Sequence, residues 1–263
     1  MNNNWPPLDL HAHIEPTIVP HELVALRAIV FAATQSLHEF RKVAARDDPV
    51  TVWGVGTHPR VPSAVSSFNV REFRKSIART PLVSEVGLDA RSAVSMSDQR
   101  RVLDDILSVL CESPRVISIH SAGATTEILD ALASRTPTGI VLHWWRGTAR
   151  ETEAAIELGA WFSINTAELR QPVVLGKVPL DRILTETDHP FGDRQIPGHQ
   201  PGQVAAIERA IATAHSTSAD VVRKELWRNL ARLVDATSTS PLLPDRIRRV
   251  LSAAKHPIRS HDN

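Results

Sequence analysis

Asp9-Leu10-His11-Ala12-His13, near the start of the chain, places three side chains that can bind metal at the end of an expected β-strand, residues 7–11. Side chains of an extended strand alternate between its two faces, so His11 and His13 point the same way. Two imidazoles on one face can bind the same metal ion. The stretch therefore predicts a metal site at a strand end, which other strand ends are expected to complete.

Four more candidate ligands each follow a short apolar run elsewhere in the chain. They are Glu85 in Val83-Ser84-Glu85-Val86-Gly87, His120 in Ile117-Ser118-Ile119-His120, His143 in Ile140-Val141-Leu142-His143 and Asp188 in Leu184-Thr185-Glu186-Thr187-Asp188. Imidazole and carboxylate groups suit divalent ions. A single His-x-His pair is weak evidence for a metal site, whereas such residues at the ends of several strands are much stronger evidence. Because a catalytic zinc usually takes about three protein ligands, this number of candidates favours two ions.

Short apolar runs rich in β-branched residues recur along the chain and are expected to be strands. They cover residues 7–11, 28–33, 50–56, 82–85, 115–120, 139–143, 161–165 and 182–186. Parallel strands alternating with helices close most naturally as a TIM-type (β/α)8 barrel of the α/β class, with the metal site at the C-terminal strand ends. An open doubly wound sheet is the alternative, but Gly54-Val55-Gly56 does not continue as a glycine-rich phosphate turn.

Helices are expected between and after these strands. Their ranges are 20–26, 36–46, 70–79, 97–111, 126–134, 148–158, 168–176, 202–215 and 219–234, the last with Ser218 as its N-cap. We assign residues 1–236 to the barrel. Residues 237–263 are rich in Ser, Pro, Arg and Asp and are expected to be a C-terminal surface tail with a short helix at 244–254.

The composition restricts the class of protein. The 263 residues are 42% hydrophobic, enough for one large core. Thirty basic and 29 acidic residues give a formal charge of +1, so no overall charge argues for nucleic acid, although a local basic groove is compatible with it. The single cysteine, the absence of a basic and apolar leader, and the lack of a long apolar run predict a soluble cytoplasmic protein without membrane association.

The motifs, taken in order, resemble those of the TatD-like metal-dependent deoxyribonucleases of the amidohydrolase superfamily. The resemblance runs from Asp9 to about Val234. It rests on Asp9-x-His11-x-His13, Gly56-Thr57-His58-Pro59, Ser84-Glu85-Val86-Gly87-Leu88-Asp89, His120-Ser121, His143-Trp144 and Glu186-Thr187-Asp188-His189-Pro190. Asn229 is similar to an asparagine near the end of the family's last helix.

The resemblance implies a role for each candidate ligand. His11, His13 and Asp188 would surround one ion, His120 and His143 the other, and Glu85 would bridge the two. The implied cofactors are two divalent metal ions, Mg²⁺, Mn²⁺ or Zn²⁺. Related phosphotriesterase-like enzymes usually have a carboxylated lysine as the bridge, so a glutamate favours a phosphodiesterase. Asp188 and Glu85 are the expected catalytic residues, with Asp188 accepting the proton of the attacking water.

Other residues are expected to support the ligands or to contact substrate. Asp9 either positions a ligand histidine or touches a metal ion. His58 contacts the scissile phosphate or stabilises its own turn. Arg146 is the nearest replacement for the family arginine that is missing at Ala122, or else a surface charge. Trp144, or its neighbour Trp145, stacks on a base or packs over the barrel rim. The altered loop at 196–202 makes the choice of substrate less certain than the metal chemistry.

The predicted function is a divalent-metal-dependent nuclease that hydrolyses DNA phosphodiester bonds, a 3′–5′ exonuclease acting on single-stranded or frayed ends. One alternative is a metal-dependent hydrolase of small phosphoesters or lactones. The other is a partner-dependent subunit of an anti-phage defence complex, with an operon-encoded protein partner. No helix-turn-helix, zinc-finger or Walker sequence occurs, so sequence-specific DNA reading is unsupported.

Overall fold

The computed structural model describes residues 5–170, 174–192, 194, 196 and 198–255. Its centre is one sheet of eight parallel strands in sequence order, each paired with the next. The strands are β1 (Leu8–Ala12), β2 (Ile29–Ala33), β3 (Thr51–Gly56), β4 (Leu82–Gly87), β5 (Val116–His120), β6 (Ile140–His143), β7 (Trp161–Ile164) and β8 (Ile183–Thr185). Each expected strand is present, with ends that differ by one or two residues.

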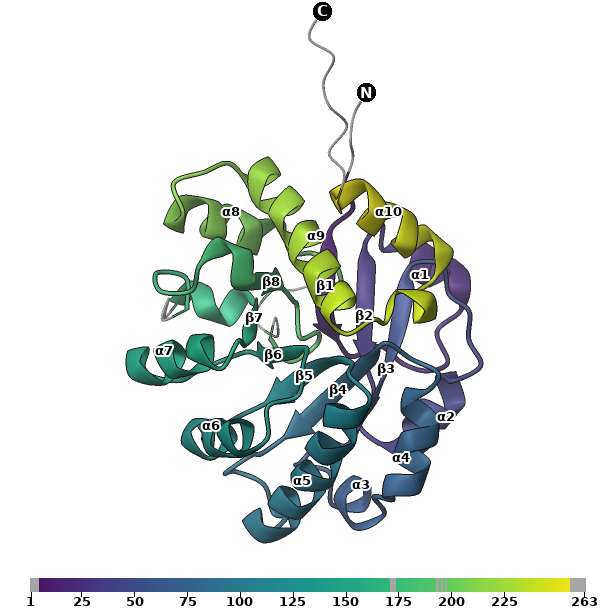
Figure 1. Cartoon of the computed structure of the whole chain (residues 1–263). Helices are drawn as coiled ribbons and strands as arrows, with labels where there is room; N and C mark the ends of the chain where they lie inside the picture. The colour runs from purple at the N-terminus through teal and green to yellow at the C-terminus, as the bar shows by residue number, and fades with distance from the viewer. Residues whose placement is uncertain (1–4, 171–173, 193, 195, 197, 256–263) are drawn as a thin grey trace, which may run out of the picture.

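The sheet curls so that its first and last strands meet. The Thr185 hydroxyl at the end of β8 donates to Leu8 O in β1 over 2.5 Å, and Asp188 N donates to His11 O over 2.8 Å. Nearly all strand residues are buried, because helices cover the outside and side chains fill the inside. The predicted TIM-type barrel is therefore confirmed and the open doubly wound sheet is wrong (Figure 1).

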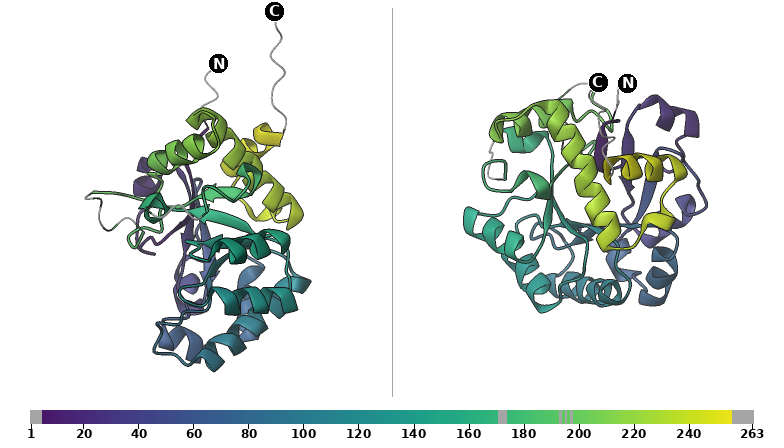
Figure 2. Two further views of the ribbon diagram at one scale, coloured as in Figure 1. Left: turned by 90° about the vertical axis from the view of Figure 1, so that its left-hand side faces the viewer. Right: turned by 45° about the horizontal axis from the view of Figure 1, so that its top comes forward.

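Helices surround the barrel, as both views of Figure 2 show. They are α1 (Pro20–Ala25), α2 (Leu37–Val43), α3 (Pro62–Ser66), α4 (Val70–Ile77), α5 (Met96–Glu112), α6 (Thr125–Ser134), α7 (Ala149–Glu157), α8 (Ala205–Ala214), α9 (Ala219–Ala236) and α10 (Asp245–Lys255). Ser218 caps α9 as predicted, since its side chain accepts from Val221 N. Most expected helices are confirmed with small shifts at their ends.

Two helix predictions need correction. The range 168–176 contains no α-helix among its described residues but overlaps a short 3-10 helix, Thr166–Arg170, and residues 171–173 lie outside the described chain. Helix α3 is absent from the sequence expectations. It begins with Pro62, whose fixed φ suits the first helical turn, but five residues are too few to give a periodic apolar pattern.

The C-terminal segment is more than a surface tail. The short helix expected at 244–254 is present as α10, which packs against α9 (Figure 1). Ile247, Leu251 and Ala254 on α10 are buried. Residues 245–255 therefore form the expected short helix and pack on α9, and residues 256–263 lie outside the described chain. None of the helices in the described part combines the length and apolar character that crossing a bilayer requires.

We expect Leu251→Ala on α10 to destabilise the whole barrel. The side chain is 3% exposed, and removing a buried leucine usually costs about 2–5 kcal/mol of unfolding free energy. Urea unfolding followed by circular dichroism measures the change. Ser252→Ala, an exposed position on the same helix, is the matched control and should leave the midpoint within experimental error. Equal midpoints for both variants would show that α10 is not part of the cooperative core.

Candidate metal centre

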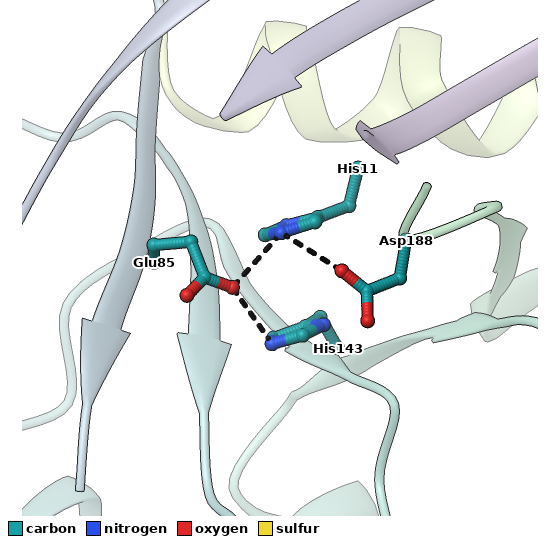
Figure 3. Close-up of side chains that lie close together, drawn as sticks. All are labelled: His11, Glu85, His143 and Asp188. Carbon is teal, nitrogen blue, oxygen red and sulfur yellow. Dashed lines mark ion pairs between the residues drawn. The ribbon is translucent and has the colours of Figure 1, made fainter. Parts of the chain in front are cut away.

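The candidate ligands meet at the C-terminal ends of the barrel strands. His11 lies in β1, Glu85 in β4, His143 ends β6, and Asp188 follows β8. Figure 3 shows these four side chains converging from different sides of the barrel. One ligand atom from each lies within 4.8 Å of the others, and all four residues are buried. Residues up to 177 positions apart in the chain thus form one compact group, which we call the first cluster.

Glu85 Oε1 is the centre of the first cluster. It lies 2.9 Å from His11 Nε2 and 3.2 Å from His143 Nε2. Asp188 Oδ1 lies 3.8 Å from His11 Nε2 on the other side. His13 is at the edge of this group, with Nε2 3.6 Å from Asp188 Oδ1 and 3.8 Å from Glu85 Oε1. The predicted convergence of His11, His13 and Asp188 is present in the structure.

The other carboxylate oxygen of Glu85 faces a second cluster, formed by His58, Glu85 and His120. Glu85 Oε2 lies 2.7 Å from His58 Nε2 and 4.0 Å from His120 Nδ1. His143 Nε2 is 3.3 Å from His120 Nδ1, so His143 lies between the two clusters. His58 Nδ1 accepts from Arg60 N over 3.1 Å, which fits the turn-stabilising role that the sequence left open beside contact with substrate. Its Nε2 has the position of a ligand-type atom.

The buried polar atoms of the centre fit a cation. His11 Nδ1 is 2.7 Å from Ser118 Oγ, which leaves Nε2 facing the carboxylate of Glu85. Among the described residues, His11 Nε2, His143 Nδ1 and Glu85 Oε2 have no hydrogen-bond partner of good geometry. Burying such atoms without partners is unfavourable, and His11 Nε2 and His143 Nε2, which both face Glu85 Oε1, offer lone pairs that a bound metal ion would satisfy. The donor set suits a divalent ion.

Groups outside the two clusters hold the histidines in place. Asp89 Oδ2 lies 2.9 Å from His120 Nε2, and Asp89 Oδ1 accepts from Arg91 N over 2.7 Å. Glu186 Oε1 is 3.6 Å from His143 Nδ1 and accepts from Trp144 N over 2.9 Å. Carboxylates that bind the outer nitrogen of a ligand histidine fix its orientation and raise its basicity. Asp89 and Glu186 are arranged for this role.

Asp9 connects the two strands that close the barrel. Its carboxylate accepts from Thr187 N over 2.8 Å, from Thr187 Oγ1 over 2.7 Å and from Gly202 N over 2.7 Å. Its remaining contact is with the backbone N of His11, at 3.4 Å. These bonds fix Thr187, which directly precedes Asp188, and hold Gly202 against the first strand. The contacts favour the positioning role for Asp9 over direct metal contact.

The backbone turns sharply at the residues that enter the centre. Glu85, Trp144 and Asp188 have φ values of 52°, 39° and 47°, in the left-handed region that non-glycine residues seldom adopt. Gly87 follows with φ 146°, and a Cβ there would lie 2.0 Å from His120 O. Such conformations persist only where the surrounding structure enforces them, and they concentrate at functional sites. These backbone conformations direct the side chains of Glu85 and Asp188 toward the candidate ligand histidines.

Burial and mutual charge shift the titration of the centre. Burial lowers the pKa of His11 and lowers the pKa of His13 to about 3. Burial would raise the pKa of Glu85, but the charge of His58 and the close ring nitrogens of His11 and His143 hold that pKa well below its usual value. Burial would lower the pKa of His143, but Glu186 and Glu85 raise it well above its usual value. Burial raises the pKa of Asp188 well above its usual value, and the charge of Glu85 adds to the rise.

The expected substrate contacts differ in their exposure. Trp145 is 1% exposed and donates from Nε1 to Thr152 Oγ1, so it packs inside the rim and is wrong as a stacking residue. Trp144 is half-buried beside Glu186. Arg146 is exposed. In the loop at 196–202, residue 197 lies outside the described chain, whereas Gly202 N is fixed by its bond to Asp9.

Two residues at the mouth of the barrel have no place in the sequence expectations. Arg60 follows the Gly56-Thr57-His58-Pro59 turn, with a side chain 56% exposed and Nε 3.7 Å from Asp89 Oδ2. Phe191 follows His189-Pro190 and is 37% exposed, with its ring edge-to-face with His13 at a centroid distance of 5.1 Å. In the sequence, both residues lie next to recognised motifs, and this is the one local feature that indicates them. The exposure and direction of their side chains depend on the fold.

Comparisons with known proteins agree with the geometry. The curated proteins similar to this chain include a 3'-5' ssDNA/RNA exonuclease TatD from Pantoea vagans, 28% identical over 60% of this chain and 65% of its own length. Another is a protein of the same name from Erwinia billingiae, 29% identical over 52% of this chain and 56% of its own length. The chain thus spans less than two thirds of the length of these relatives.

Solved structures share the fold at lower identity. The structure of YJJV, a TatD homolog from Escherichia coli k12, superposes with a TM-score of 0.74 and 19% identity, covering 86% of this chain and 97% of that one. A TatD family hydrolase from Entamoeba histolytica superposes with a TM-score of 0.71 and 13% identity, covering 87% of this chain and 97% of the other. At these identities the superpositions establish the barrel architecture.

The family itself follows from the sequence match to the whole barrel. The model of the family described as TatD related DNase matches residues 8–235. This range contains all eight strands and both clusters of candidate ligands. The resemblance found in the motifs is confirmed, and the chain belongs to the TatD related DNase family.

Proposed function

We propose that this protein is a metal-dependent phosphodiesterase that removes nucleotides from single-stranded DNA in the 3′–5′ direction. The observation that carries the proposal is the Glu85 carboxylate, whose two oxygens face two separate clusters of histidines. A shared carboxylate is the arrangement that two-metal hydrolases use to hold two ions close together. The names of the curated relatives, 3'-5' ssDNA/RNA exonuclease, support the substrate class and polarity.

Each cluster supplies the residues that would hold an ion. His11, His13, His143 and Asp188 would hold one with Glu85 Oε1, and His58 and His120 would hold the other with Glu85 Oε2. Divalent ions, when bound, make water nucleophilic at neutral pH and stabilise charge on the attacking and leaving oxygens. Mg²⁺, Mn²⁺ and Zn²⁺ are the candidates, because histidine and carboxylate sites accept all three.

The protein's own groups handle the proton and the geometry. Asp188 Oδ1 points at the centre beside His11 and His13, so an ionised Asp188 can accept the proton of the attacking water. Glu186 and Asp89 keep the rings of His143 and His120 in fixed orientations. Burial of Glu85 and His11 excludes bulk water from the ligand side of the centre.

Arg60 supplies a permanent positive charge for the substrate phosphate. The nearby carboxylate of Asp89 already accepts hydrogen bonds on both oxygens, from Arg91 N and from His120. At 3.7 Å Arg60 Nε is an ion-pair neighbour of Asp89 rather than a hydrogen-bond donor to it, and most of the guanidinium faces solvent. A planar guanidinium at the mouth can bind a phosphate through two parallel hydrogen bonds.

The lone Cys111 is a free thiol, which supports placing the protein in a reducing cytoplasm, where disulfides are rare. A protein partner, as in a defence complex, stays a prediction from the sequence.

Metal binding to the stripped protein is expected to release protons near pH 7. The pKa values of His143 and Asp188 are raised, so the metal-free centre holds protons on these groups to higher pH than usual, and an ion competes with those protons. Affinity should therefore fall as the pH falls, by about tenfold per pH unit for each proton released. Calorimetric titration of Mn²⁺ in two buffers of different ionisation enthalpy counts the protons. Glu186→Gln should reduce the count, because Glu186 raises the pKa of His143.

Asp188→Asn and Glu85→Ala are expected to fail in different ways. Asp188→Asn removes the proton acceptor and should slow cleavage of 5′-labelled single-stranded DNA by about 10² or more, while the second cluster keeps its ion. Glu85→Ala should lower the metal content of both clusters, measured by elemental analysis after dialysis. Glu153→Gln, an exposed glutamate on α7, is the control for the carboxylate change.

Full metal content in both variants, with parental cleavage by Asp188→Asn, would contradict the assignment of these residues. A metal-loaded protein that leaves DNA and RNA intact but hydrolyses lactones or small phosphoesters would move the function to the small-molecule alternative.

Arg60→Ala is expected to raise the KM for single-stranded DNA by roughly tenfold or more with a smaller change in kcat, since a charged hydrogen bond to phosphate is lost. The slope of log KM against log salt concentration should fall by about 0.7, the value for one phosphate contact on a single strand. Arg71→Ala, an exposed arginine on α4, should change neither quantity. A lower melting temperature with unchanged KM would instead make the pair with Asp89 purely structural.

A further inference from the structure

A cavity of about 890 Å³ opens beside the metal centre, between the segment that follows β1 and the segment that follows β8. His13 forms part of its wall, so the cavity and the first cluster share a side chain. Ile14, Ile18 and Leu26 line the same space and make much of it apolar. Its volume falls in the range of about 300–1,000 Å³ that is typical of small-molecule sites.

Phe191 lines this cavity close to the reacting centre. Its backbone N donates to Asp188 O over 2.6 Å, which holds the residue in a tight turn directly after the proposed proton acceptor. The ring meets the His13 ring at an interplanar angle of 83°, and the Arg194 guanidinium carbon lies 4.8 Å from the ring centroid. The side chain is nevertheless 37% exposed. A large aromatic ring that is fixed and still partly open to a cavity is suited to stacking.

The charge of the cavity decides which part of a nucleic acid it can take. Glu15, Glu22 and Glu39 line it together with the apolar residues. These three carboxylates outnumber the single positive charge of Arg194 beside the Phe191 ring, so the cavity as a whole disfavours a phosphate group but not an uncharged base and sugar. The exposed Arg60 belongs to the other side of the centre, because it neighbours Asp89, whose carboxylate contacts His120 of the second cluster. The two sides of Glu85 therefore favour different parts of a nucleotide.

We propose that the cavity is the subsite for the terminal nucleoside of the strand, with Phe191 stacking on its base while the scissile phosphate lies over Glu85 toward Arg60. The proposal deepens the proposed nuclease function and depends on it for the identity of the ligand. Stacking on Phe191 would make binding of the strand depend on whether its terminal nucleoside carries a base. It would depend little on which base that is, since every base has an aromatic face.

The test compares two 5′-labelled DNA single strands of equal length. One ends in an ordinary 3′ nucleoside and the other in a 3′ abasic residue that lacks only the base. Fluorescence anisotropy measures the affinity of the metal-free protein for each strand, so this readout does not require catalysis. The second readout is the rate at which the Mn²⁺-loaded protein releases the terminal residue.

The wild-type protein is expected to bind the strand with the terminal base about tenfold more tightly than the abasic strand, the effect of one stacked base. Phe191→Ala should bring this ratio close to one, and Phe191→Trp should keep it. Val221→Ala removes an exposed hydrophobic side chain on α9, outside the cavity lining, and should keep the wild-type ratio.

Equal affinity of the wild type for both strands, or a ratio that survives Phe191→Ala, would overturn the subsite. Its failure is distinguishable from failure of the nuclease proposal. Cleavage of DNA without a base-dependent ratio refutes the subsite alone. A base-dependent ratio that Phe191→Ala abolishes, in a metal-loaded protein that cleaves no DNA, supports the subsite and refutes the nuclease proposal.

Discussion

The burial of the Glu85 carboxylate is the constraint on which the rest of the structure depends. This side chain is about 2% exposed, and a buried charge is tolerated only when neighbouring groups compensate it. His11 and His143 compensate one oxygen, and His58 the other. These partners come from the ends of different strands, so the barrel has to close for the charge to be satisfied. The stability of the centre and the closure of the sheet are therefore linked.

Asp9 provides the contacts that link closure of the sheet to the geometry of the centre. It is fully buried near the start of the first strand and binds Thr187 and Gly202 beyond the last strand. Burial raises the pKa of Asp9 to about 6, although its hydrogen bonds act in the opposite direction. The residue thus joins the two edges of the sheet and fixes the turn that presents Asp188. The hydrogen bonds of Asp9 that close the barrel therefore also position Asp188, the proposed proton acceptor.

The mouth of the barrel has two chemically different sides. On one side the exposed guanidinium of Arg60 lies near Asp89, and on the other Phe191 lines a cavity that carries carboxylates. A polyanionic strand is attracted by the first and repelled by the second, except at its uncharged base and sugar. For the proposed nucleic-acid substrate, this asymmetry would favour one orientation over Glu85. The net charge of the chain does not predict this difference between the two sides, because the numbers of basic and acidic residues are nearly equal.

The sequence by itself determined the barrel, the family and the candidate ligands that converge in the structure, since strand periodicity and the order of motifs can be read along the chain without coordinates. Only the tertiary structure decided that His58 joins the second cluster, that Trp145 is buried rather than available for stacking, and that residues 245–255 pack against α9. It also decided that Phe191 faces a cavity. The physical reason is that burial and the direction of a side chain depend on contacts between segments far apart in the chain. Such contacts exist only after the strands have closed.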